Sequence, residues 1–439
     1  MAEILPFRGT RYNPAVIKEL SSVICPPYDI ITPQQQNELY KLSPYNFVRI
    51  EYNRELPQDT GRDNRYTRAA ANLSQWLEAG ILQDDSVPAI YFHRHHFACN
   101  GNQRHRDNFL ACVRLEEWDK RIIRPHENII PRAKSDRLSM LYACQADTSP
   151  ILAMFQDPEN IVASTLDCLG KIQPVIDVVE SFGERHQVWS ITQLEVINQI
   201  RQQMVGQPLY IADGHHRYDS ALTYKRERTS QSASSDGDEG YNFVMMSLVS
   251  FSDPGLVILP PHRLIRGISR PVLASLKTQL QAFFDIQSLS ITSPDLWQLV
   301  DRRLTGITPD TDYVSLAVFG LEADNLLILT LRDTRAVSQF MPQFHGDLYK
   351  KLDVSLVDHV ILEKLLAFDK DKEEITLAYS YDRSEAVNLV RDQQYQLAFI
   401  LNPVQPELIK NVADIGDRMP RKSTYFYPKS PAGLVCYRW

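Results

Sequence analysis

The segment PLYIADGHHRYDSALTYKRE, residues 208–227, constrains the fold more than any other part of the chain. Residues 209–212 form a short apolar run that is typical of a buried strand, and Asp213-Gly214 is a turn signal. One face of the following helix is marked at helical spacing by Tyr218, Ala221, Leu222 and Lys225. Strands and helices alternate elsewhere in the chain too, so we predict an α/β (mixed α+β) fold.

The turn in this segment carries the strongest signal for a binding site. His215, His216 and Arg217 fall in the first helical turn, where free backbone N–H groups and the positive end of the helix dipole gather. A bound anion would neutralise this cationic cluster, and phosphate is a natural candidate. Arg217 can hold a phosphate bidentately, while Asp213 can cap the helix, orient a hydroxyl or hold a metal through its water. The alternative is that Asp213 is only an N-cap and the histidines are only solvated; we favour the anion or nucleotide site.

A second cluster lies in KRIIRPHENIIPRAKSDRLSML, residues 120–141. Pro125 and Pro131 should keep the chain extended, and Ser135 should cap a new helix. Glu127 then lies on a stiff loop among cationic residues, which are Arg124, His126, Arg132 and Lys134. A carboxylate in such surroundings should stay ionised and can serve as a general base for a hydroxyl. Taken alone, the charge run is more typical of a solvated loop than of a site.

A third cluster spans residues 418–429 and offers donors suited to a phosphate or a carboxylate, namely Arg421, Lys422, Ser423, Thr424 and Lys429. Three proline-containing or aromatic segments are ambiguous. Their polar residues either line a cleft or belong to rigid loops packed on the core; they are Asp29, Glu51, His262 and Arg263.

Two other kinds of site are disfavoured. His93 and His95 share one face of an expected strand and could bind zinc, but no further histidine or carboxylate stands at a recognised ligand spacing. The chain also lacks a G-x-S-x-G elbow, a G-x-x-x-x-G-K-[ST] loop and a G-x-G-x-x-G fingerprint. A nucleotide site in this protein must therefore be of another kind.

Local patterns predict the remaining elements. Residues 64–80 read as an amphipathic helix that ends at Gly80, and two strands flank Asn100-Gly101 with residues 101–108 as their turn. Residues 229–240 are small, polar and acidic, which predicts a mobile loop. After Arg266 the pattern restarts with helices and strands, including helices over residues 271–284 and 353–368.

Composition narrows the functional classes. The formal net charge of −7 argues against nucleic acid as a partner. No apolar run approaches the ~18 residues of a membrane-spanning helix, and the six cysteines form no C-x-x-C pair. We expect a soluble, cytoplasmic protein with reduced thiols, no membrane contact, and an oligomeric state that the sequence leaves open, a homodimer included.

Several segments together carry a family resemblance. IADGHHRYDSAL resembles the phosphate-binding segment of the ParB and sulfiredoxin superfamily, although His215 stands where sulfiredoxin chemistry needs a cysteine. RPHE (residues 124–127), ADGHHR (212–217) and PRKST (420–424) resemble three segments of the free-serine kinases in the same order. Over nearly its whole length the chain is also similar to the bacterial and archaeal family known as domain of unknown function 1015. The resemblance is carried by PPYDII, YNFVRIE, the segment from PHE to SDRL (residues 125–138), IADGHHRY, HRLI and RMPRKSTYFYPK.

The resemblance implies roles for individual residues. Glu127 would be the catalytic base, Asp213 would help to position substrate or Mg²⁺, and the nucleotide phosphates would be held by Gly214, His215, His216 and Arg217. The acceptor or the transferred phosphate would be bound by His126, Lys422, Ser423 and Thr424.

The resulting hypothesis is a small-molecule phosphotransferase that uses ATP or ADP with Mg²⁺, and most simply converts free L-serine to O-phosphoserine. We expect an N-terminal α+β region (1–118), a ParB/sulfiredoxin-like core (119–266), and a C-terminal α/β region (267–439) that closes the site. The alternative, from another class, is a ParB-like nucleotide-binding switch or regulatory protein without catalysis.

Overall fold

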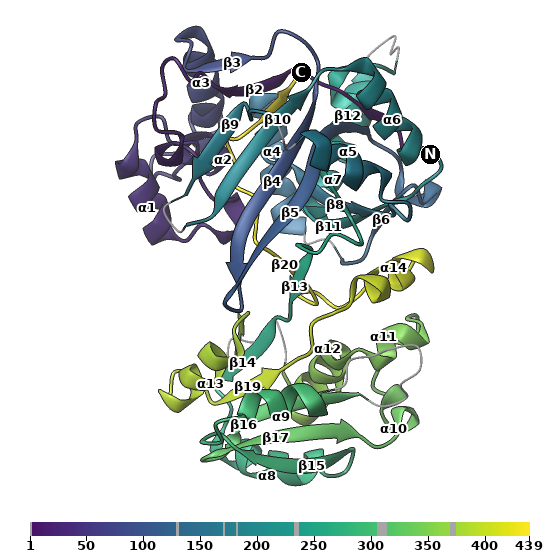
Figure 1. The fold of residues 1–439 in the computed structure, drawn as a ribbon. Coiled ribbons are helices and arrows are strands. Elements are labelled where there is room, and N and C mark those ends of the chain that lie inside the picture. The colour runs from purple at the N-terminus through teal and green to yellow at the C-terminus, as the bar shows by residue number, and fades with distance from the viewer. Residues whose placement is uncertain are drawn as a thin grey trace. The chain divides into compact units, whose positions relative to one another are not determined.

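The computed structural model describes residues 2–128, 131–169, 172–180, 183–231, 237–304, 314–368 and 375–439, with only the backbone described for 131–134 and 169. The chain forms two compact units. Unit 1 comprises Met1–Pro125, Ile129–Val257 and Pro428–Trp439, and it contains both chain ends (Figure 1). Unit 2 comprises His126–Asn128 and Ile258–Tyr427. Both units mix helices and strands, which confirms the predicted mixed α/β class.

A mixed sheet forms the centre of unit 1, with the strand order β6-β11-β8-β12-β5-β4-β10-β9 and with β1 paired to β5. β6 with β11 and β8 with β12 are parallel pairs, and the other neighbours are antiparallel. The strands are β1 (Ile4–Leu5), β4 (Ile90–Cys99), β5 (Asn102–Arg114), β6 (Ile123–Pro125), β8 (Ile151–Phe155), β9 (Ile176–Val179), β10 (Arg185–Ile191), β11 (Leu209–Asp213) and β12 (Phe243–Ser250).

Helices cover one face of this sheet. Alternate strand residues such as Phe92, Phe109 and Trp189 meet apolar residues of the helices in one buried core. The helices of unit 1 are α1 (Pro33–Leu42), α2 (Val48–Glu51), α3 (Arg65–Glu78), α4 (Pro131–Cys144), α5 (Ile161–Leu169), α6 (Leu194–Met204) and α7 (His215–Gln231), with short 3₁₀ turns η1 (Leu20–Ser22), η2 (Tyr28–Ile30), η3 (Trp118–Lys120) and η4 (Gly240–Asn242). α5, α6 and α7 all contribute buried residues to this core.

The opposite face of the sheet changes from apolar to polar along the strands. At one end it is covered by an apolar cluster that includes Tyr91, Leu110 and Val188. Continuing along the same strands, the alternate positions are buried polar residues, among them His93, His95, Arg106, Asn108, His186 and Ser247. Because burying polar groups costs free energy unless they are paired, this half of the face calls for a chemical explanation.

The C-terminal segment, residues 428–439, lies on this second face. Lys429 bonds to Asp213 in β11, the backbone of Ala432 pairs with that of Cys25, and Leu434 and Val435 join the apolar cluster. Its last strand completes a small sheet of order β3-β2-β21-β7, formed by β2 (Gly9–Tyr12), β3 (Leu82–Asp84), β7 (Ala146–Asp147) and β21 (Cys436–Arg438). The segment thus fixes residues far apart in sequence within unit 1.

Unit 2 is built on an antiparallel sheet of order β15-β17-β16-β19-β14-β18. Its strands are β14 (His262–Arg266), β15 (Phe284–Ser290), β16 (Ser315–Glu322), β17 (Asn325–Leu331), β18 (Thr376–Ser380) and β19 (Leu397–Ile400); β13 (Val257–Leu259) pairs with β20 (Tyr425–Tyr427). Its helices are α8 (Arg270–Leu280), α9 (Leu296–Arg303), α10 (Thr334–Ser338), α11 (Asp347–Lys351), α12 (Asp353–Ser355), α13 (Arg383–Arg391) and α14 (Pro406–Asp414), with the π-helix η5 (Leu356–Leu365) following α12.

Several local predictions are confirmed. α3 begins after the capping box of Asn64 and is followed by Gly80 at a φ of 67°. Asn100 and Gly101, both with positive φ, form the hairpin turn between β4 and β5. Among the described helices, none combines the length and apolarity that crossing a bilayer requires.

Other local predictions need correction. Residues 102–108 belong to β5 and not to a turn, because each pairs with a residue of β4. α4 begins at Pro131, so Ser135 lies inside the helix; proline suits a first helical position, where its missing N–H is not needed. α7 continues to Gln231, so residues 229–231 of the predicted loop are helical, and 232–236 lie outside the described residues. The division into regions 1–118, 119–266 and 267–439 stays a prediction.

Gly433 provides a test of how the C-terminal segment is held. Its φ is +94°, and a Cβ atom there would lie 2.9 Å from Cγ of the buried Phe47. Gly433→Ala should therefore lower the free energy of unfolding by about 2 kcal/mol, measured by urea denaturation. Gly61→Ala is the control, because a Cβ at Gly61 meets nothing within 4 Å. Equal stability of the two variants would contradict this packing.

Candidate functional site

Gly214 joins β11 to α7 in a conformation that favours glycine. Its φ is +97°, and a Cβ at this position would lie 2.9 Å from Nε of Arg217. The absence of a side chain lets Arg217 fold back over the turn toward the end of β11. His215 and His216 occupy the first turn of α7, as predicted; His215 is buried and His216 is half-buried.

Asp213, the last residue of β11, lies at the centre of an ion network in unit 1. Lys429 donates to its Oδ1 atom, and Nη2 of Arg217 donates to Oδ2 over 2.6 Å. Burial alone would raise the pKa of Asp213, but Lys429 and Arg217 together hold it below its usual range. Asp213 is therefore an ionised carboxylate at neutral pH.

The guanidinium of Arg217 is bound inside the protein. Besides Asp213, it donates through Nη1 to the carbonyl of Pro150 over 2.5 Å and to Oγ of Ser149 over 3.3 Å, while its buried Nε has no hydrogen-bond partner among the described residues. The carboxylate of Asp213 therefore pairs with Arg217 through a single N–H group. The role of Arg217 as a phosphate ligand stays a prediction.

Glu51 extends this network. It is fully buried, and it accepts hydrogen bonds from Oγ1 of Thr148 over 2.5 Å and from Oγ of Ser149 over 3.0 Å. Nη1 of Arg137 lies 3.9 Å away. Glu51 is therefore connected to Asp213 through Ser149 and Arg217. The sequence marked Glu51 as ambiguous and included Arg137 in the SDRL segment of the family resemblance, but it gave no signal for Ser149.

Arg106 is a second buried cation that sequence analysis missed. Its side chain is fully buried on the polar half of the sheet face, and Nη2 donates to Oγ of Ser430 over 3.2 Å. Among the described residues, Nε and Nη1 have no hydrogen-bond partner. Burial lowers the pKa of Arg106 to about 10, against the opposing effect of Asp253, Glu184 and Asp213. An arginine with unsatisfied donors is suited to an incoming anion.

In unit 2 the structure brings Glu127 together with the third cluster. Oε1 of Glu127 accepts from the backbone N–H of Ser423 over 3.2 Å, and from the N–H and Oγ1 of Thr424 over 3.3 and 3.2 Å. Nε2 of the buried His126 lies 3.0 Å from Oγ1 of Thr424, and the N–H of Met419 donates to the carbonyl of His126. Two segments almost 300 residues apart therefore form one cluster.

The remaining members of the predicted clusters have different surroundings. Lys422 is exposed, with a φ of 55°, and Arg421 is exposed. Arg124 belongs to unit 1, where its Nη1 donates to Oη of Tyr210 over 3.1 Å. The side chains of Arg132 and Lys134 lie outside the described residues.

The structure separates the four ambiguous residues. Glu51 belongs to the ion network, and Asp29 is exposed on η2. His262 and Arg263 are buried on β14 in unit 2, where Nδ1 of His262 accepts from the N–H of Leu401 and Arg263 lies beside Asp358. Burial lowers the pKa of His262 to about 3, so its imidazole is neutral at pH 7.

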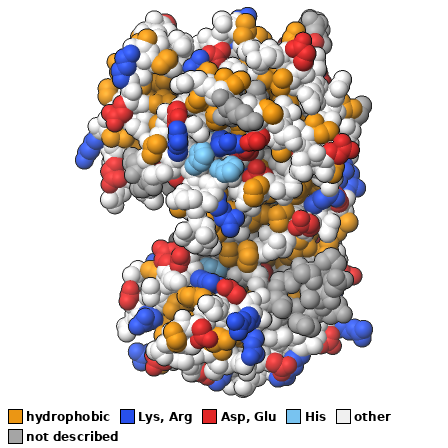
Figure 2. Space-filling model, in the orientation of Figure 1, with side chains coloured by type: hydrophobic (Ala, Val, Ile, Leu, Met, Phe, Trp, Pro, Cys, Tyr) orange, Lys and Arg blue, Asp and Glu red, His pale blue; other side chains and the backbone are white. Residues whose placement is uncertain are grey.

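The predicted residues are thus divided between the two units. Asp213, Gly214, His215, His216 and Arg217 belong to unit 1, together with Lys429, whereas unit 2 contains His126, Glu127, Lys422, Ser423 and Thr424. On the surface of unit 1, Figure 2 shows histidine side chains beside acidic and basic ones.

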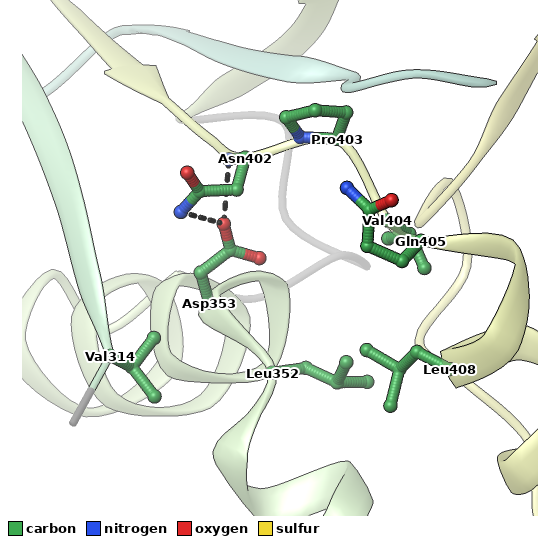
Figure 3. Close-up of a pocket in the computed structure, with 8 residues that line it drawn as sticks. All are labelled: Val314, Leu352, Asp353, Asn402, Pro403, Val404, Gln405 and Leu408. Carbon is green, nitrogen blue, oxygen red and sulfur yellow. Dashed lines mark hydrogen bonds between the residues drawn. The ribbon is translucent and has the colours of Figure 1, made fainter. Parts of the chain in front are cut away.

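A pocket in unit 2 contains none of these residues. It lies beside α12 and α14 and is lined by Val314, Leu352, Asp353, Asn402, Pro403, Val404, Gln405 and Leu408 (Figure 3). Its carboxylate is already engaged, because the backbone N–H and the side-chain Nδ2 of Asn402 both donate to Oδ2 of Asp353 over 2.8 and 3.2 Å. The lining is otherwise mostly apolar. The ion network and the Glu127 cluster contain more charged and hydrogen-bonding groups, so they are the stronger candidates for a functional site.

Comparison with known protein families identifies the family of this chain. The family model described as protein of unknown function (DUF1015) matches residues 4–355. The chain belongs to this family. The predicted membership in the DUF1015 family is thereby confirmed. A search of curated proteins gave no match.

Solved structures show only a distant likeness to this DUF1015 member. A free serine kinase in complex with AMP is 12% identical with a TM-score of 0.33, over 70% of this chain and 86% of that chain. SbnI with a C-terminal truncation, from Staphylococcus aureus, is 12% identical with a TM-score of 0.34, over 74% and 86% of the two chains. A conserved hypothetical protein from Pyrococcus furiosus is 13% identical with a TM-score of 0.33, over 71% and 92%. Values this low assign no function to the chain.

The ion network predicts that replacing Lys429 lowers the stability of the protein more than replacing an exposed lysine does. Lys429→Met would leave the carboxylate of Asp213 with one cation fewer, and should lower the free energy of unfolding by about 2 to 3 kcal/mol. Lys120→Met is the control: its ion pair with Glu116 joins a lysine side chain that is 56% exposed, and it should cost less than about 1 kcal/mol. Chemical denaturation of both variants measures the difference.

A double variant separates charge from packing. If the cost comes from an uncompensated carboxylate, Lys429→Met with Asp213→Asn should recover part of the stability that Lys429→Met loses. Strictly additive losses would show that Lys429 stabilises the protein by packing alone.

Proposed function

We propose that this protein is a phosphotransferase that moves a nucleotide phosphate to the hydroxyl of a small molecule, with free L-serine as the acceptor and O-phosphoserine as the product. The observation that carries the proposal is the bonding of Glu127 to Ser423 and Thr424 in unit 2. It joins two segments, RPHE and PRKST, that are separated by 296 residues and that both resemble segments of the free-serine kinases.

Glu127 is the residue that we assign as general base. Its Oε1 atom is fixed by the donors of Ser423 and Thr424, and no described residue donates to Oε2. A carboxylate held by one oxygen presents the other in a defined direction, which is the arrangement a proton acceptor needs. Oε2 would accept the proton of the serine hydroxyl.

The acceptor would be held by the same cluster. Lys422 would supply a positive charge for the carboxylate of serine or for the transferred phosphate. The hydroxyls of Ser423 and Thr424 donate to the carbonyl of Pro420 and to Oε1 of Glu127, so their oxygens would accept hydrogen bonds from the ammonium group of serine. His126 would support this arrangement through its contact with Oγ1 of Thr424.

The nucleotide would be held in unit 1. Gly214, His215, His216 and Arg217 form the turn and the first helical residues, where backbone N–H groups favour phosphate. Asp213 would orient these cations, and Lys429, which the resemblance does not include, adds a positive charge beside it. Binding of an anion would relieve the crowding of cations around this one carboxylate.

The transfer itself requires mainly positioning and charge neutralisation. A bond forms between the serine oxygen and the terminal phosphorus, the bond from that phosphorus to its bridging oxygen breaks, and the electron pair stays on the departing nucleotide. The proton of the hydroxyl passes to Glu127. ATP would leave ADP, and ADP would leave AMP.

Mg²⁺ would neutralise the phosphates when it is bound. Both oxygens of Asp213 already accept from Lys429 and Arg217, so this carboxylate is suited to hold the ion through a water molecule rather than directly.

Phosphorus NMR tests the proposal. Protein with Mg²⁺, L-serine and either ATP or ADP should produce a phosphomonoester signal, and Glu127→Gln should lower its rate by about 100-fold or more because the base is lost. Glu55→Gln is the matched control, because the side chain of Glu55 is 78% exposed. Tight nucleotide binding without any phosphorylated product would contradict the kinase and leave the non-catalytic nucleotide switch in its place.

A further inference from the structure

Strand geometry gathers histidines and glutamates on the polar half of the sheet face in unit 1. His93 and His95 are two residues apart on β4 and therefore share a face. β10 runs antiparallel beside β4, with His186 directly opposite His95. Glu184, two residues before His186, extends the same face of the neighbouring strand. All four side chains therefore point to the same side of the sheet.

The resulting contacts are short. Nε2 of His95 lies 2.7 Å from Oε2 of Glu184, and Nδ1 of His186 lies 3.0 Å from Nε2 of His93. Nε2 of His186 lies 2.9 Å from Oε1 of Glu180. One ligand atom from each of His95, Glu184 and His186 lies within 4.8 Å of the other two.

The histidines of this cluster are buried, but its glutamates are partly exposed to solvent. The side chains of His95 and His186 are 0% exposed, whereas those of Glu184 and Glu180 are 22% and 18% exposed. Nδ1 of His95 is buried without a hydrogen-bond partner among the described residues. Three adjacent imidazoles with one unsatisfied nitrogen are an expensive arrangement for a purely structural core, because each polar atom left without a partner costs free energy.

The chemistry of these groups matches a particular class of ligand. A neutral imidazole nitrogen is among the commonest metal ligands in proteins. Two imidazoles and one carboxylate are the protein ligands of many zinc sites with an open fourth position. Imidazole nitrogen favours transition metals over Mg²⁺, which prefers oxygen ligands.

We propose that His95, His186 and Glu184 bind one divalent transition-metal ion of the zinc class. Glu180 is placed to supply a further carboxylate, and His93 to orient His186 through its ring nitrogen. Ligand atoms of a tetrahedral zinc ion lie roughly 3.4 Å apart, so the contact of 2.7 Å between His95 and Glu184 must widen. The positive charge of Arg106 disfavours a metal cation nearby, whereas the carboxylates of Glu184 and Glu180 favour its binding.

This site is separate from the proposed use of Mg²⁺ with a nucleotide. It uses none of the residues assigned to phosphoryl transfer. Its ligands are His95 of β4, His186 of β10 and Glu184, the residue before β10. A protein that binds the metal but phosphorylates nothing would support this site and not the kinase, and the converse result would do the opposite.

The test uses the full-length protein, freed of metal with a chelator, and Co²⁺ as a spectroscopic probe. One equivalent of Co²⁺ should produce visible d–d absorption of a tetrahedral or five-coordinate ion, and one equivalent of Zn²⁺ should abolish it. His95→Ala and Glu184→Gln should each weaken binding by about 100-fold or more. Glu184→Gln changes a partly exposed side chain and so keeps the test valid if His95→Ala does not fold.

His96→Ala is the matched control. His96 is the next residue on β4 but faces the other side of the sheet, where its Nε2 contacts Oε1 of Gln187. This variant should keep full Co²⁺ binding. Absence of stoichiometric Co²⁺ binding in the wild-type protein, or equal loss in His96→Ala and Glu184→Gln, would overturn the proposal.

Discussion

The ion network around Asp213 is the interaction on which the organisation of unit 1 depends. It joins the end of β11, the first turn of α7 and the C-terminal segment through Arg217 and Lys429. Charges in a partly buried place cost free energy unless they are paired, so these three groups must stay together. Two cations contact the one carboxylate of Asp213 beside the N-terminus of α7. Free backbone N–H groups at that N-terminus are the physical reason for expecting an anion there.

The sequence predicted the elements that local chemistry determines. The strand, glycine turn and helix around Gly214, the hairpin at Asn100-Gly101 and the capped helix α3 all depend on residues that are neighbours in the chain. The contacts between Glu51 and Ser149, 98 residues apart, carry no local signature. Arg106 was assigned to a turn, because its segment is polar, and only pairing with β4 shows that it is a buried strand residue.

The histidines of β4 are a second case in which contacts between distant residues could not be predicted from the sequence. His93 and His95 have no metal-ligand partner at a short spacing, so the sequence disfavoured a zinc site. Strand pairing supplies the missing partners, because the register of β10 places His186 opposite His95 and Glu184 on the same face. Ligands that come from separate strands follow from sheet register, which the sequence alone does not specify.

Membership in the DUF1015 family identifies the relatives of this protein but does not identify the reaction that it catalyses. The proposed reaction depends on two clusters: Asp213 with its cations in unit 1, and Glu127 with residues 422–424 in unit 2. Each cluster is internally connected, and each offers one half of what phosphoryl transfer needs. We propose that the cluster in unit 1 binds the nucleotide and that the cluster in unit 2 binds the acceptor.

Hydrogen exchange measured by mass spectrometry tests this claim most directly. The full-length protein is compared with and without ADP or ATP, Mg²⁺ and L-serine. We expect the nucleotide to slow exchange in peptides covering residues 209–218 and L-serine to slow exchange in peptides covering 419–427, with β15 unchanged as the internal reference. No nucleotide-dependent protection at 209–218, or no serine-dependent protection at 419–427, would contradict the roles proposed for the two clusters.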